Sequence, residues 1–313
     1  MSDTAVSLIN LTKTFGSHKA VDDVSLDVPA GSCYGFIGPN GSGKSTTLRM
    51  IMRILSQDSG DVVVLGGKNT ARPDDRVGYL PEERGLYKQM KVADVLKFYA
   101  AIKGAQTSKS EIMTWLDNLG LADWHDKKIE QLSKGMSQKV QFIATVISKP
   151  KVVLLDEVFS GLDPVNREVM TEQIVDLRRS GTTVIFSTHD MSTAEAMCDR
   201  VFMIYKGKKV LDNTLDAIRT EYGTDTARVV VDGADGDEMG RIAGVAQVRD
   251  MGRVQELRLE KNIDEQQVLA GLMELGQVRR FELTQPSLHD IFVRIAKPAA
   301  EDLSVPAAPA VAV

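Results

Sequence analysis

Short apolar runs alternate with helix-like segments over the first two thirds of the chain. Three of these runs, SCYGFIG at 32–38, KVVLLDE at 151–157 and TTVIFSTHD at 182–190, are short and mostly apolar. Segments of helical character lie between them, at 45–55 and 164–180. Strands that are apolar on both faces and separated by helices are typical of a mostly parallel sheet covered on both sides. The pattern therefore predicts an α/β fold.

Two further regions modify this prediction. Residues 5–37 contain short strands separated by turns. Between about 88 and 150 the apolar positions follow a helical period, with Val92, Val95 and Leu96 on one face. We expect this block to be a helical subdomain inserted between strands.

The pattern changes near EYGTDT at 221–226. Several later stretches, such as ARVVVDG and VQELRLEK, alternate with a period of two and are interleaved with helix-like segments. We therefore predict a large domain over 1–220 and a small α+β domain over 221–297, which ends in the helix PSLHDIFVRIA. The Ala-, Pro- and Val-rich residues 298–313 are expected to form a disordered tail.

Composition and charge are those of a folded protein without a broad basic surface. Of the 313 residues, 43% are apolar and 26% are charged, and 38 basic against 43 acidic residues give a net charge of -5. This balance disfavours nonspecific binding to nucleic acid. The two cysteines, Cys33 and Cys198, lack the spacing of a metal site and are expected to be buried and reduced.

The sequence contains no predicted membrane-crossing or secretory segment. No apolar run reaches the length of a membrane helix, and the first residues, MSDTAVSLIN, lack a basic region that leads into an apolar one. A role at a membrane would therefore require docking onto another protein.

The stretch GPNGSGKST, Gly38–Thr46, matches the pattern G-x-x-x-x-G-K-[ST] of a phosphate-binding loop. It lies between a predicted strand and a predicted helix, which is the context that this loop requires. The glycines let successive backbone N–H groups point at phosphates, and the helix dipole adds positive potential. We expect Lys44 to reach the β- and γ-phosphates and the Ser45 hydroxyl to bind Mg²⁺.

Polar side chains follow two other predicted strands. VVLLDE places Asp156 and Glu157 where open α/β sheets bind their ligands. We expect Asp156 to hold Mg²⁺ through its water shell and Glu157 to polarise the attacking water; a solvated acidic strand end is the alternative. His189 ends the next strand, close to the expected γ-phosphate, although a single histidine there is more often structural.

The stretch LSKGMSQ at 132–138 is compatible with two roles. Ser133 followed by an apolar-periodic run is how many ordinary helices begin, so the stretch can be a helix cap and nothing more. The stretch can instead be half of an active site whose other half is missing. Nothing local decides between the two.

Taken together, these motifs resemble the nucleotide-binding subunit of an ATP-binding cassette (ABC) transporter. The resemblance covers about residues 5–215, and the motifs occur in the family's order. LPEE occupies the Q-loop, LSKGM stands for the signature motif LSGGQ, LLDE is Walker B, and SGLD is the D-loop. The implied fold is a P-loop NTPase ABC cassette, a mostly parallel sheet with antiparallel N-terminal strands and a helical subdomain.

The resemblance implies roles for individual residues. Glu157, His189 and Lys44 are the implied catalytic residues, and Ser45, Asp156 and Glu82 the implied Mg²⁺ ligands. The residues implied to bind ATP are Phe15, Gly38, Pro39, Asn40, Gly41, Ser42, Gly43, Lys44, Ser45, Thr46, Ser133, Gly135 and Asp163.

The family resemblance also implies a role for the helix that begins at the signature motif LSKGM. The phosphate loop of one subunit faces the signature helix of another, so Ser133 and the Gly135 N–H are implied to bind the γ-phosphate on the opposite subunit. One cassette per chain then carries two half-sites. An ATP-dependent head-to-tail dimer with two sandwiched ATP molecules is implied.

The sequence departs from the family pattern at three motifs. Lys134 replaces the first glycine of LSGGQ and Met136 its glutamine, which adds a cation and removes a polar contact. Glu82 stands where the Q-loop has glutamine; it can still ligate Mg²⁺ but adds negative charge near the γ-phosphate. Phe15 keeps the stacking face of the commoner tyrosine.

The expected function is an ATP hydrolase that energises an integral-membrane permease from the cytoplasmic, inner face of the cell membrane. The stretches LPEERGLY and PSLHDIF resemble ATPases of type-2 exporters, the branch with sodium-efflux and drug-export systems, and favour export over import. The alternatives are a soluble ABC ATPase acting on nucleic acid or ribosomes, whose usual second cassette or basic extension is not visible, and a regulator that only binds nucleotide. No nucleic-acid partner is expected.

Overall fold

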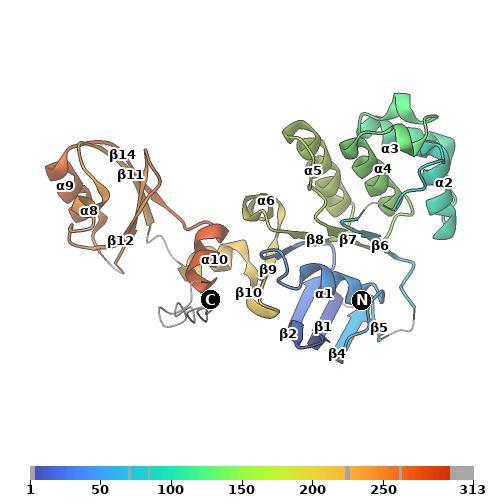
Figure 1. The fold of residues 1–313 in the computed structure, drawn as a ribbon, viewed down its shortest axis with the longest axis horizontal. Coiled ribbons are helices and arrows are strands. Elements are labelled where there is room, and N and C mark those ends of the chain that lie inside the picture. The colour runs from blue at the N-terminus through green and yellow to red at the C-terminus, as the bar shows by residue number, and fades with distance from the viewer. Residues whose placement is uncertain (1–3, 70–71, 84, 223–225, 261–262, 297–313) are drawn as a thin grey trace, which may run out of the picture. The chain divides into compact units, whose positions relative to one another are not determined.

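The computed structural model describes residues 4–69, 72–83, 85–222, 226–260 and 263–296 (Figure 1). The chain forms two compact units, which divide after Leu215. The boundary predicted at 220 lies within the helix α7 (Leu215–Tyr222), five residues after this division. The predicted tail at 298–313 lies outside the described residues.

The first unit contains two sheets. One is antiparallel, and its strand order is β2 (His18–Pro29), β1 (Thr4–Phe15), β4 (Ser59–Val64) and β5 (Gly67–Lys68). The strand order of the other is β10 (Lys208–Thr214), β9 (Arg200–Tyr205), β3 (Cys33–Ile37), β8 (Thr183–Thr188), β7 (Val152–Asp156) and β6 (Val77–Leu80). Its pairs are parallel except for β9 with β10. The predicted mostly parallel sheet with antiparallel N-terminal strands is confirmed.

Helices cover the parallel sheet and form a separate block between β6 and β7. The helices of the first unit are α1 (Lys44–Ile51), α2 (Val92–Ile102), α3 (Lys109–Asn118), α4 (Lys134–Val146), α5 (Pro164–Arg179) and α6 (Met191–Met197). Two 3₁₀ turns, η1 (Ala122–Trp124) and η2 (Ile129–Gln131), separate α3 from α4. In Figure 1, α2, α3 and α4 stand together beyond the β6 side of the sheet.

The parallel strands position the candidate site because their carboxyl ends lie side by side. Asp156 at the end of β7 is in register with Ser187 on β8, and Ile37 at the end of β3 with Thr188. Burial fixes these strands, since every residue of β3, β7 and β8 is buried. The phosphate loop, the acidic pair and His189 therefore follow three neighbouring strands.

The second unit has an α+β organisation. Its antiparallel sheet has the order β12 (Val245–Asp250), β13 (Gln255–Leu259), β11 (Thr226–Asp232) and β14 (Gln277–Thr284). The other helices of this unit are α8 (Gly236–Met239), α9 (Glu265–Leu275) and α10 (Leu288–Ala296). The apolar core lies between one face of the sheet and α8 and α9, and it comprises Ala227, Val229, Val231, Met239, Leu257, Leu259, Val268 and Leu272. The opposite face of the sheet carries the polar side chains of the alternating strands.

Candidate nucleotide-binding site

The phosphate loop has a backbone conformation that only glycine adopts readily. Gly38 and Gly43 have φ values of 152° and 113°. A Cβ atom at Gly43 would overlap the carbonyl oxygen of Ala20, and one at Gly38 would overlap that of Ile204. α1 begins directly after this loop, at Lys44. The loop and the first turn of the helix therefore form one local unit of the kind that binds phosphate.

Lys44 lies within the phosphate loop and is buried, with 5% of its surface exposed. Its Nζ donates hydrogen bonds to the carbonyl oxygens of Gly38 at 2.7 Å and Pro39 at 3.1 Å, and it lies 3.7 Å from Glu157 Oε1. Burial lowers the pKa of Lys44, and the charges of Glu157, Asp156 and Glu82 oppose this shift. The ammonium is thus held at the loop by carbonyl groups and by a neighbouring carboxylate.

Asp156 has one oxygen that is fully paired and one that is not. Oδ1 accepts hydrogen bonds from Ser45 Oγ at 3.0 Å and from Ser187 Oγ at 2.5 Å. Oδ2 is buried and has no hydrogen-bond partner among the described residues. Buried carboxylate oxygens are normally paired, so this one fits a cation that arrives with the substrate.

The described residues contain no cluster of three or more His, Cys, Asp and Glu side chains suited to hold a metal ion alone. Mg²⁺ that enters with a nucleotide needs only one or two protein carboxylates, because phosphates and water supply its other ligands. Ser45, Asp156 and Glu82 fit such a shared site, since Ser45 contacts Asp156 and both Ser45 and Glu82 line the cavity described below.

Glu157 adopts a left-handed backbone conformation, with φ of 50°. Its N–H donates to the backbone oxygen and to Oγ of Ser187, both at 3.2 Å, which holds this turn against β8. A non-glycine residue in this region costs on the order of 1–3 kcal/mol and is found most often at functional sites. The carboxylate oxygens of Glu157 lie 3.0 and 3.1 Å from His189 Nδ1.

Lys44, Ser45 and Glu157 border a cavity of about 460 Å³. Its described lining residues are Phe15, His18, Ala20, Asn40, Gly41, Gly43, Lys44, Ser45, Thr46, Glu82 and Glu157. Phe15 stands at one end with 49% of its surface exposed, as an aromatic ring available for stacking. The ring of His189 is 58% exposed while its Nδ1 contacts Glu157. One side of the imidazole is therefore anchored and the other is open.

Two residues of this site were missed by sequence reasoning. His18 lines the cavity from the start of β2, and Ser187 joins Asp156 to the backbone of Glu157. The position of Ser187 two residues before His189 in the predicted strand TTVIFSTHD was a usable signal, because alternate residues of a strand share a face. His18 belongs to no motif and had no comparable signal.

The signature and D-loop residues lie outside this cavity. Ser133 is the exposed N-cap of α4, where its Oγ accepts a hydrogen bond from the Met136 N–H at 3.2 Å. Asp163 caps α5 in the same way, and hydrogen bonds from Asn166 lower the pKa of its carboxyl group. Neither Ser133, Gly135 nor Asp163 is among the described residues that line the cavity. A single chain does not bring them to the phosphate loop.

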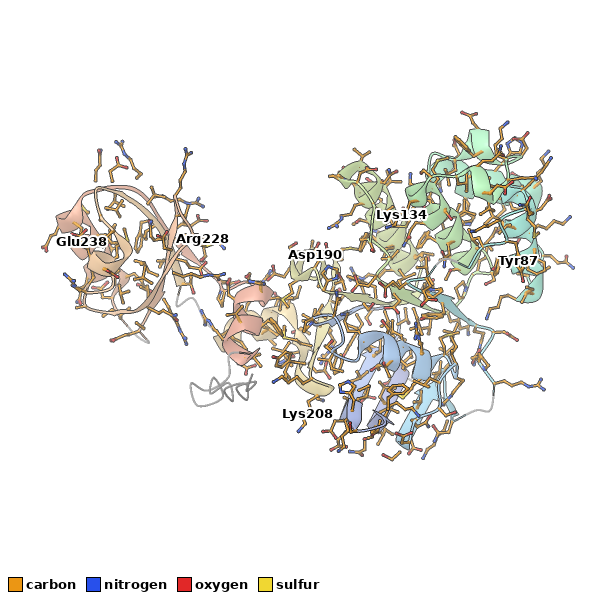
Figure 2. The ribbon with its side chains drawn as sticks, viewed as in Figure 1. Tyr87, Lys134, Asp190, Lys208, Arg228 and Glu238 are labelled. Carbon is orange, nitrogen blue, oxygen red and sulfur yellow. The ribbon has the colours of Figure 1, made fainter. Side chains whose placement is uncertain are left out.

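Lys134 occupies the position where the signature of the family has glycine. Its side chain packs on Gly161, where an added Cβ would lie 2.9 Å from Lys134 Cε and 3.0 Å from its Nζ. Figure 2 shows Lys134 at the start of α4, on the side of α5. The ammonium group of Lys134 therefore lies against the turn that precedes Asp163, close to the N-terminus of α4.

Comparisons with known proteins identify the family. The family described as ABC transporter matches residues 21–160, and the family described as the C-terminal domain of DrrA1-3-like ATP-binding proteins matches residues 214–296. The chain is 39% identical to the uncharacterized ABC transporter ATP-binding protein YhaQ of Bacillus subtilis over 293 residues. This match covers 92% of this chain and 97% of that protein. This chain belongs to the ABC transporter ATP-binding proteins.

Two other ABC proteins extend the comparison. The chain is 30% identical over 302 residues to the Nod factor export ATP-binding protein I of Sinorhizobium fredii, covering 94% of this chain and 86% of that protein. A solved ATP-binding subunit of an ABC transporter superposes with a TM-score of 0.64 at 28% identity, covering 70% of this chain and 94% of that chain.

The family resemblance drawn from the motifs is therefore confirmed. As an ABC ATP-binding protein, the chain binds nucleotide and is an ATPase of a membrane transport system. Within its described residues, no helix is long and apolar enough to cross a membrane.

Proposed function

We propose that this chain hydrolyses Mg-ATP to drive an exporter, and that each ATP is held between the phosphate loop of one subunit and the signature helix of another. The observation that carries the proposal is that the phosphate-loop residues and the signature residues, both implied to bind ATP, lie apart within one chain. The cavity gathers Lys44 and Glu157, whereas Ser133 and Gly135 lie outside it. The exposed start of α4 offers N–H groups and a positive dipole end, which suit the γ-phosphate of a second copy. Asp163 lies at the next helix start and would face the same junction.

The roles of this chain's residues follow from their contacts. Lys44 exchanges its hydrogen bonds with the loop carbonyls for oxygens of the β- and γ-phosphates. The backbone N–H groups of residues 40–46 and the dipole of α1 bind the same phosphates. Phe15 supplies a stacking face for the adenine ring.

Glu157 is placed to act as the general base. Its carboxylate borders the cavity, is largely desolvated and is oriented by His189. A carboxylate in this position accepts a proton from the attacking water as the water approaches the γ-phosphorus. Lys44, the open side of His189 and Ser133 of the second subunit then stabilise the charge on the transferring phosphoryl group.

Ser45, Asp156 and Glu82 are the residues that would hold Mg²⁺ in this proposal, and the unpaired Oδ2 of Asp156 supports that role. The ion, when bound, neutralises negative charge on the β- and γ-phosphate oxygens. Ser187 keeps the Asp156 carboxylate in position by donating to Oδ1.

A groove of about 500 Å³ between the parallel sheet and the helical block is the proposed docking surface for the permease. Tyr79, Pro81, Leu86, Tyr99 and Ile102 line much of it. At its margin, Ile54 and Ile102 are 59% and 60% exposed. An exposed apolar groove with a few polar groups suits a short amphipathic segment of a membrane protein. The groove includes Pro81, the residue before Glu82, so a bound segment would lie next to the Q-loop.

The proposal includes an arrangement in the cell. The chain would work as an ATP-dependent dimer on the inner face of the cell membrane, bound to one or more permease subunits, and without a nucleic-acid partner. Residues 1–220 would form the ATPase domain, with the helical subdomain at about 88–150 as the coupling element and 221–297 as an accessory domain. The relative named for Nod factor export supports export as the direction.

The test is a pull-down of the tagged chain from detergent-solubilised membranes of its host, followed by mass spectrometry. Recovery of a multi-span membrane protein near one-to-one is expected. Ile102→Glu should abolish this recovery and leave basal ATP hydrolysis unchanged, whereas Met273→Glu, at a methionine that is 65% exposed in the second unit, should change neither. Recovery of ribosomes or DNA-processing proteins without a membrane partner would overturn the transporter role.

A further inference from the structure

Arg167 lies on α5, one helical turn after the D-loop aspartate. Its N–H donates a hydrogen bond to the carbonyl oxygen of Asp163 at 2.9 Å, in the first turn of the helix. Asp163 caps this helix by accepting a hydrogen bond from the Asn166 N–H, also at 2.9 Å. The D-loop aspartate and Arg167 therefore belong to one rigid turn, so a movement of one displaces the other.

The guanidinium group of Arg167 reaches the turn that carries His189. Its Nη1 donates a hydrogen bond to Asp190 Oδ2 at 2.7 Å. Asp190 directly follows His189 and is the N-cap residue of α6 (Figure 2). A charge-assisted hydrogen bond thus joins the helix of the D-loop to the turn of His189.

The carboxylate of Asp190 is held in one orientation by the first turn of α6. Oδ1 accepts hydrogen bonds from Ser192 Oγ at 2.6 Å and from the Thr193 N–H at 3.2 Å, and Oδ2 accepts one from Thr193 Oγ1 at 2.8 Å. Burial raises the pKa of Asp190, but these hydrogen bonds and the one from Arg167 lower it well below its usual value, so the carboxylate stays ionised. Because this acceptor is fixed, the ion pair transmits a displacement of Arg167 to the adjoining His189.

Arg167 also contacts the loop that carries Glu157. Its guanidinium carbon lies 5.9 Å from the centroid of the Phe159 ring, which is a cation–π distance. Phe159 follows Glu157 by two residues, is 5% exposed, and packs edge-to-face on Phe186 of β8 with ring centroids 6.1 Å apart. Since Glu157 Oε2 lies 3.0 Å from His189 Nδ1, Arg167 touches both loops whose side chains form this contact.

The alternative is a surface ion pair that only fastens α5 to α6. The side chains of Arg167 and Asp190 are 41% and 31% exposed, and pairs of this exposure contribute little to folding stability. A second pair on the same helix provides a comparison, because Arg178 Nη2 lies 2.6 Å from Asp199 Oδ1 with 42% and 34% of the side chains exposed. The two pairs are alike in length and exposure. They differ in place, since Arg178 lies at the opposite end of α5 from the D-loop.

We propose that Arg167 is a positioning residue for ATP hydrolysis, which holds the His189 turn, and through it Glu157, in the orientation set by the D-loop helix. The part of this inference that concerns the D-loop rests on the proposed function, in which Asp163 faces a second subunit. Contact with that subunit would fix the start of α5, and Arg167 would then hold His189 against the Glu157 carboxylate. Arg167 is not among the described residues that line the cavity, so it acts through Asp190.

Steady-state hydrolysis and nucleotide binding by the full chain test the proposal. Arg167→Ala should lower kcat about tenfold to a hundredfold, since small misplacements of reacting groups have effects of this size. It should leave KM and the affinity for a fluorescent ATP analogue within about twofold of wild type, because the phosphate loop is intact. Arg178→Ala is the matched control and should change neither quantity. An equal loss of kcat in the two variants overturns the proposal.

Conservative variants separate positioning from a loss of packing. Arg167→Lys keeps the charge but loses the planar group over Phe159, so it should recover part of the lost kcat. Asp190→Asn keeps a side chain that caps α6 and removes the charge, so it should also lower kcat. If the pair acts as one unit, the double variant Arg167→Ala/Asp190→Asn is no slower than Arg167→Ala, whereas effects that multiply overturn the proposal. Circular dichroism establishes folding, and if Arg167→Ala is not folded, Asp190→Asn and Arg167→Lys decide.

The ATP-dependent dimer is measured separately by analytical ultracentrifugation. Glu157→Gln and the double variant Glu157→Gln/Arg167→Ala should sediment alike at saturating ATP. A dimer that is lost only in the double variant overturns the proposal, because Arg167 then acts on contact between subunits. If neither variant dimerises, the shared site of the proposed function is wrong, while a loss of kcat that is specific to Arg167→Ala still establishes the positioning of His189 within one chain.

Discussion

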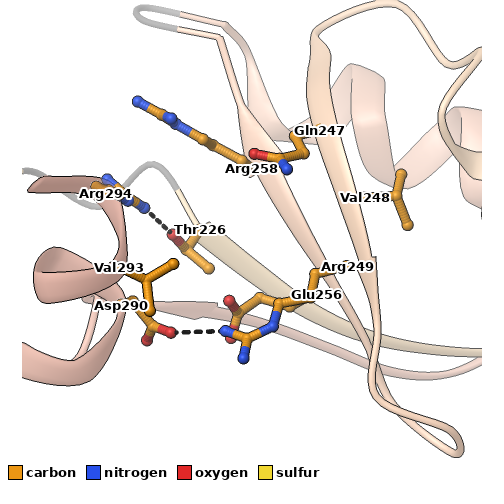
Figure 3. A pocket seen from close by; sticks show the side chains of 9 residues that line it. All are labelled: Thr226, Gln247, Val248, Arg249, Glu256, Arg258, Asp290, Val293 and Arg294. Atoms are coloured by element: carbon orange, nitrogen blue, oxygen red, sulfur yellow. Dashed lines mark hydrogen bonds and ion pairs between the residues drawn. The ribbon is translucent and has the colours of Figure 1, made fainter. Parts of the chain in front are cut away.

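The phosphate-loop cavity of the first unit and a second cavity, in the second unit, are built from different parts of the chain. The first uses backbone N–H groups, a helix start and the buried ammonium of Lys44. The second, of about 350 Å³, is lined by side chains that are distant in sequence, such as Arg249 on β12 and Asp290 on α10 (Figure 3). A site made of backbone depends on local dihedral angles, whereas a cavity made of side chains depends on strand register and on how α10 packs. Their responses to substitution should therefore differ.

The largest expected effect belongs to the chemical step of the first cavity. Glu157→Gln removes the base but keeps the shape, so ATP hydrolysis should fall about 10²–10⁴-fold while ATP still binds. Phosphate release measures the rate, and analytical ultracentrifugation should show an ATP-dependent dimer. Glu172→Gln, at an exposed glutamate of α5, is the control. A Glu157→Gln chain that stays monomeric at saturating ATP would contradict the shared site.

Removal of the buried ammonium of the phosphate loop should reduce nucleotide affinity. Lys44→Ala loses a charge-assisted contact with phosphate and leaves Glu157 without the ammonium that lies 3.7 Å away. ATP binding should weaken about tenfold to a hundredfold, which corresponds to a strong hydrogen bond to a charged group. Fluorescence titration with a labelled nucleotide measures this affinity. Lys109→Ala, at an exposed lysine of α3, should leave it unchanged.

A glycine substitution tests whether the first cavity depends on its backbone. Gly43→Ala places a Cβ against the Ala20 carbonyl at a φ of 113°, so the free energy of unfolding should fall by about 1–3 kcal/mol. Urea unfolding provides the measurement. Gly85→Ala is the control, since a Cβ added at Gly85 would meet no atom within 4 Å among the described residues. Equal stability of the two variants would show that loop strain does not constrain the site.

The smallest effect concerns the ion pair that Asp290 makes with Arg249, at 3.1 Å, in the second cavity. Burial raises the pKa of Asp290, but hydrogen bonds from Ser287 and the charges of Arg249 and His289 lower it below its usual value in the folded chain. Its contribution to stability is therefore present above the pKa of an unfolded aspartate, about 3.9, and is lost as pH falls through the lower folded value.

Asp290→Asn should therefore lower the unfolding temperature of the second unit at pH 7, and the difference from wild type should shrink as pH falls below the pKa of an unfolded aspartate. Differential scanning calorimetry measures this difference in unfolding temperature, and Asp237→Asn on α8 is the control. A difference that is constant with pH would show that the carboxylate charge is not responsible.

The comparison also explains which features the sequence alone could predict. Backbone sites leave contiguous motifs, so the phosphate loop, the Asp156–Glu157 pair and His189 were predicted from short stretches and lie together at the ends of β3, β7 and β8. The role proposed for the signature serine followed only from the family resemblance, because in that arrangement the phosphate it would bind lies on another subunit. The assignment of individual functional residues stays a prediction until the variants are measured.

Other features depend on contacts that no stretch of sequence contains. Arg258 and Thr226 are neighbours only because β13 and β11 pair in one particular register, and shifting the register by one residue would move Arg258 to the apolar face. The position of Lys134 over Gly161 likewise requires α4 and the turn before α5 to pack together. Such contacts are set by tertiary packing, which hydrophobic periodicity does not encode.

The hydrogen bonds of Lys44 with the carbonyl oxygens of Gly38 and Pro39 have a kinetic consequence. They already hold the loop and its ammonium in the receptive arrangement, so an arriving nucleotide exchanges hydrogen-bond partners and does not have to fold the loop. Little chain ordering then separates the encounter from the bound state. We therefore expect ATP to associate at a rate limited by diffusion and orientation, and the lifetime of the bound state to be set by how fast the loop carbonyls recapture the lysine.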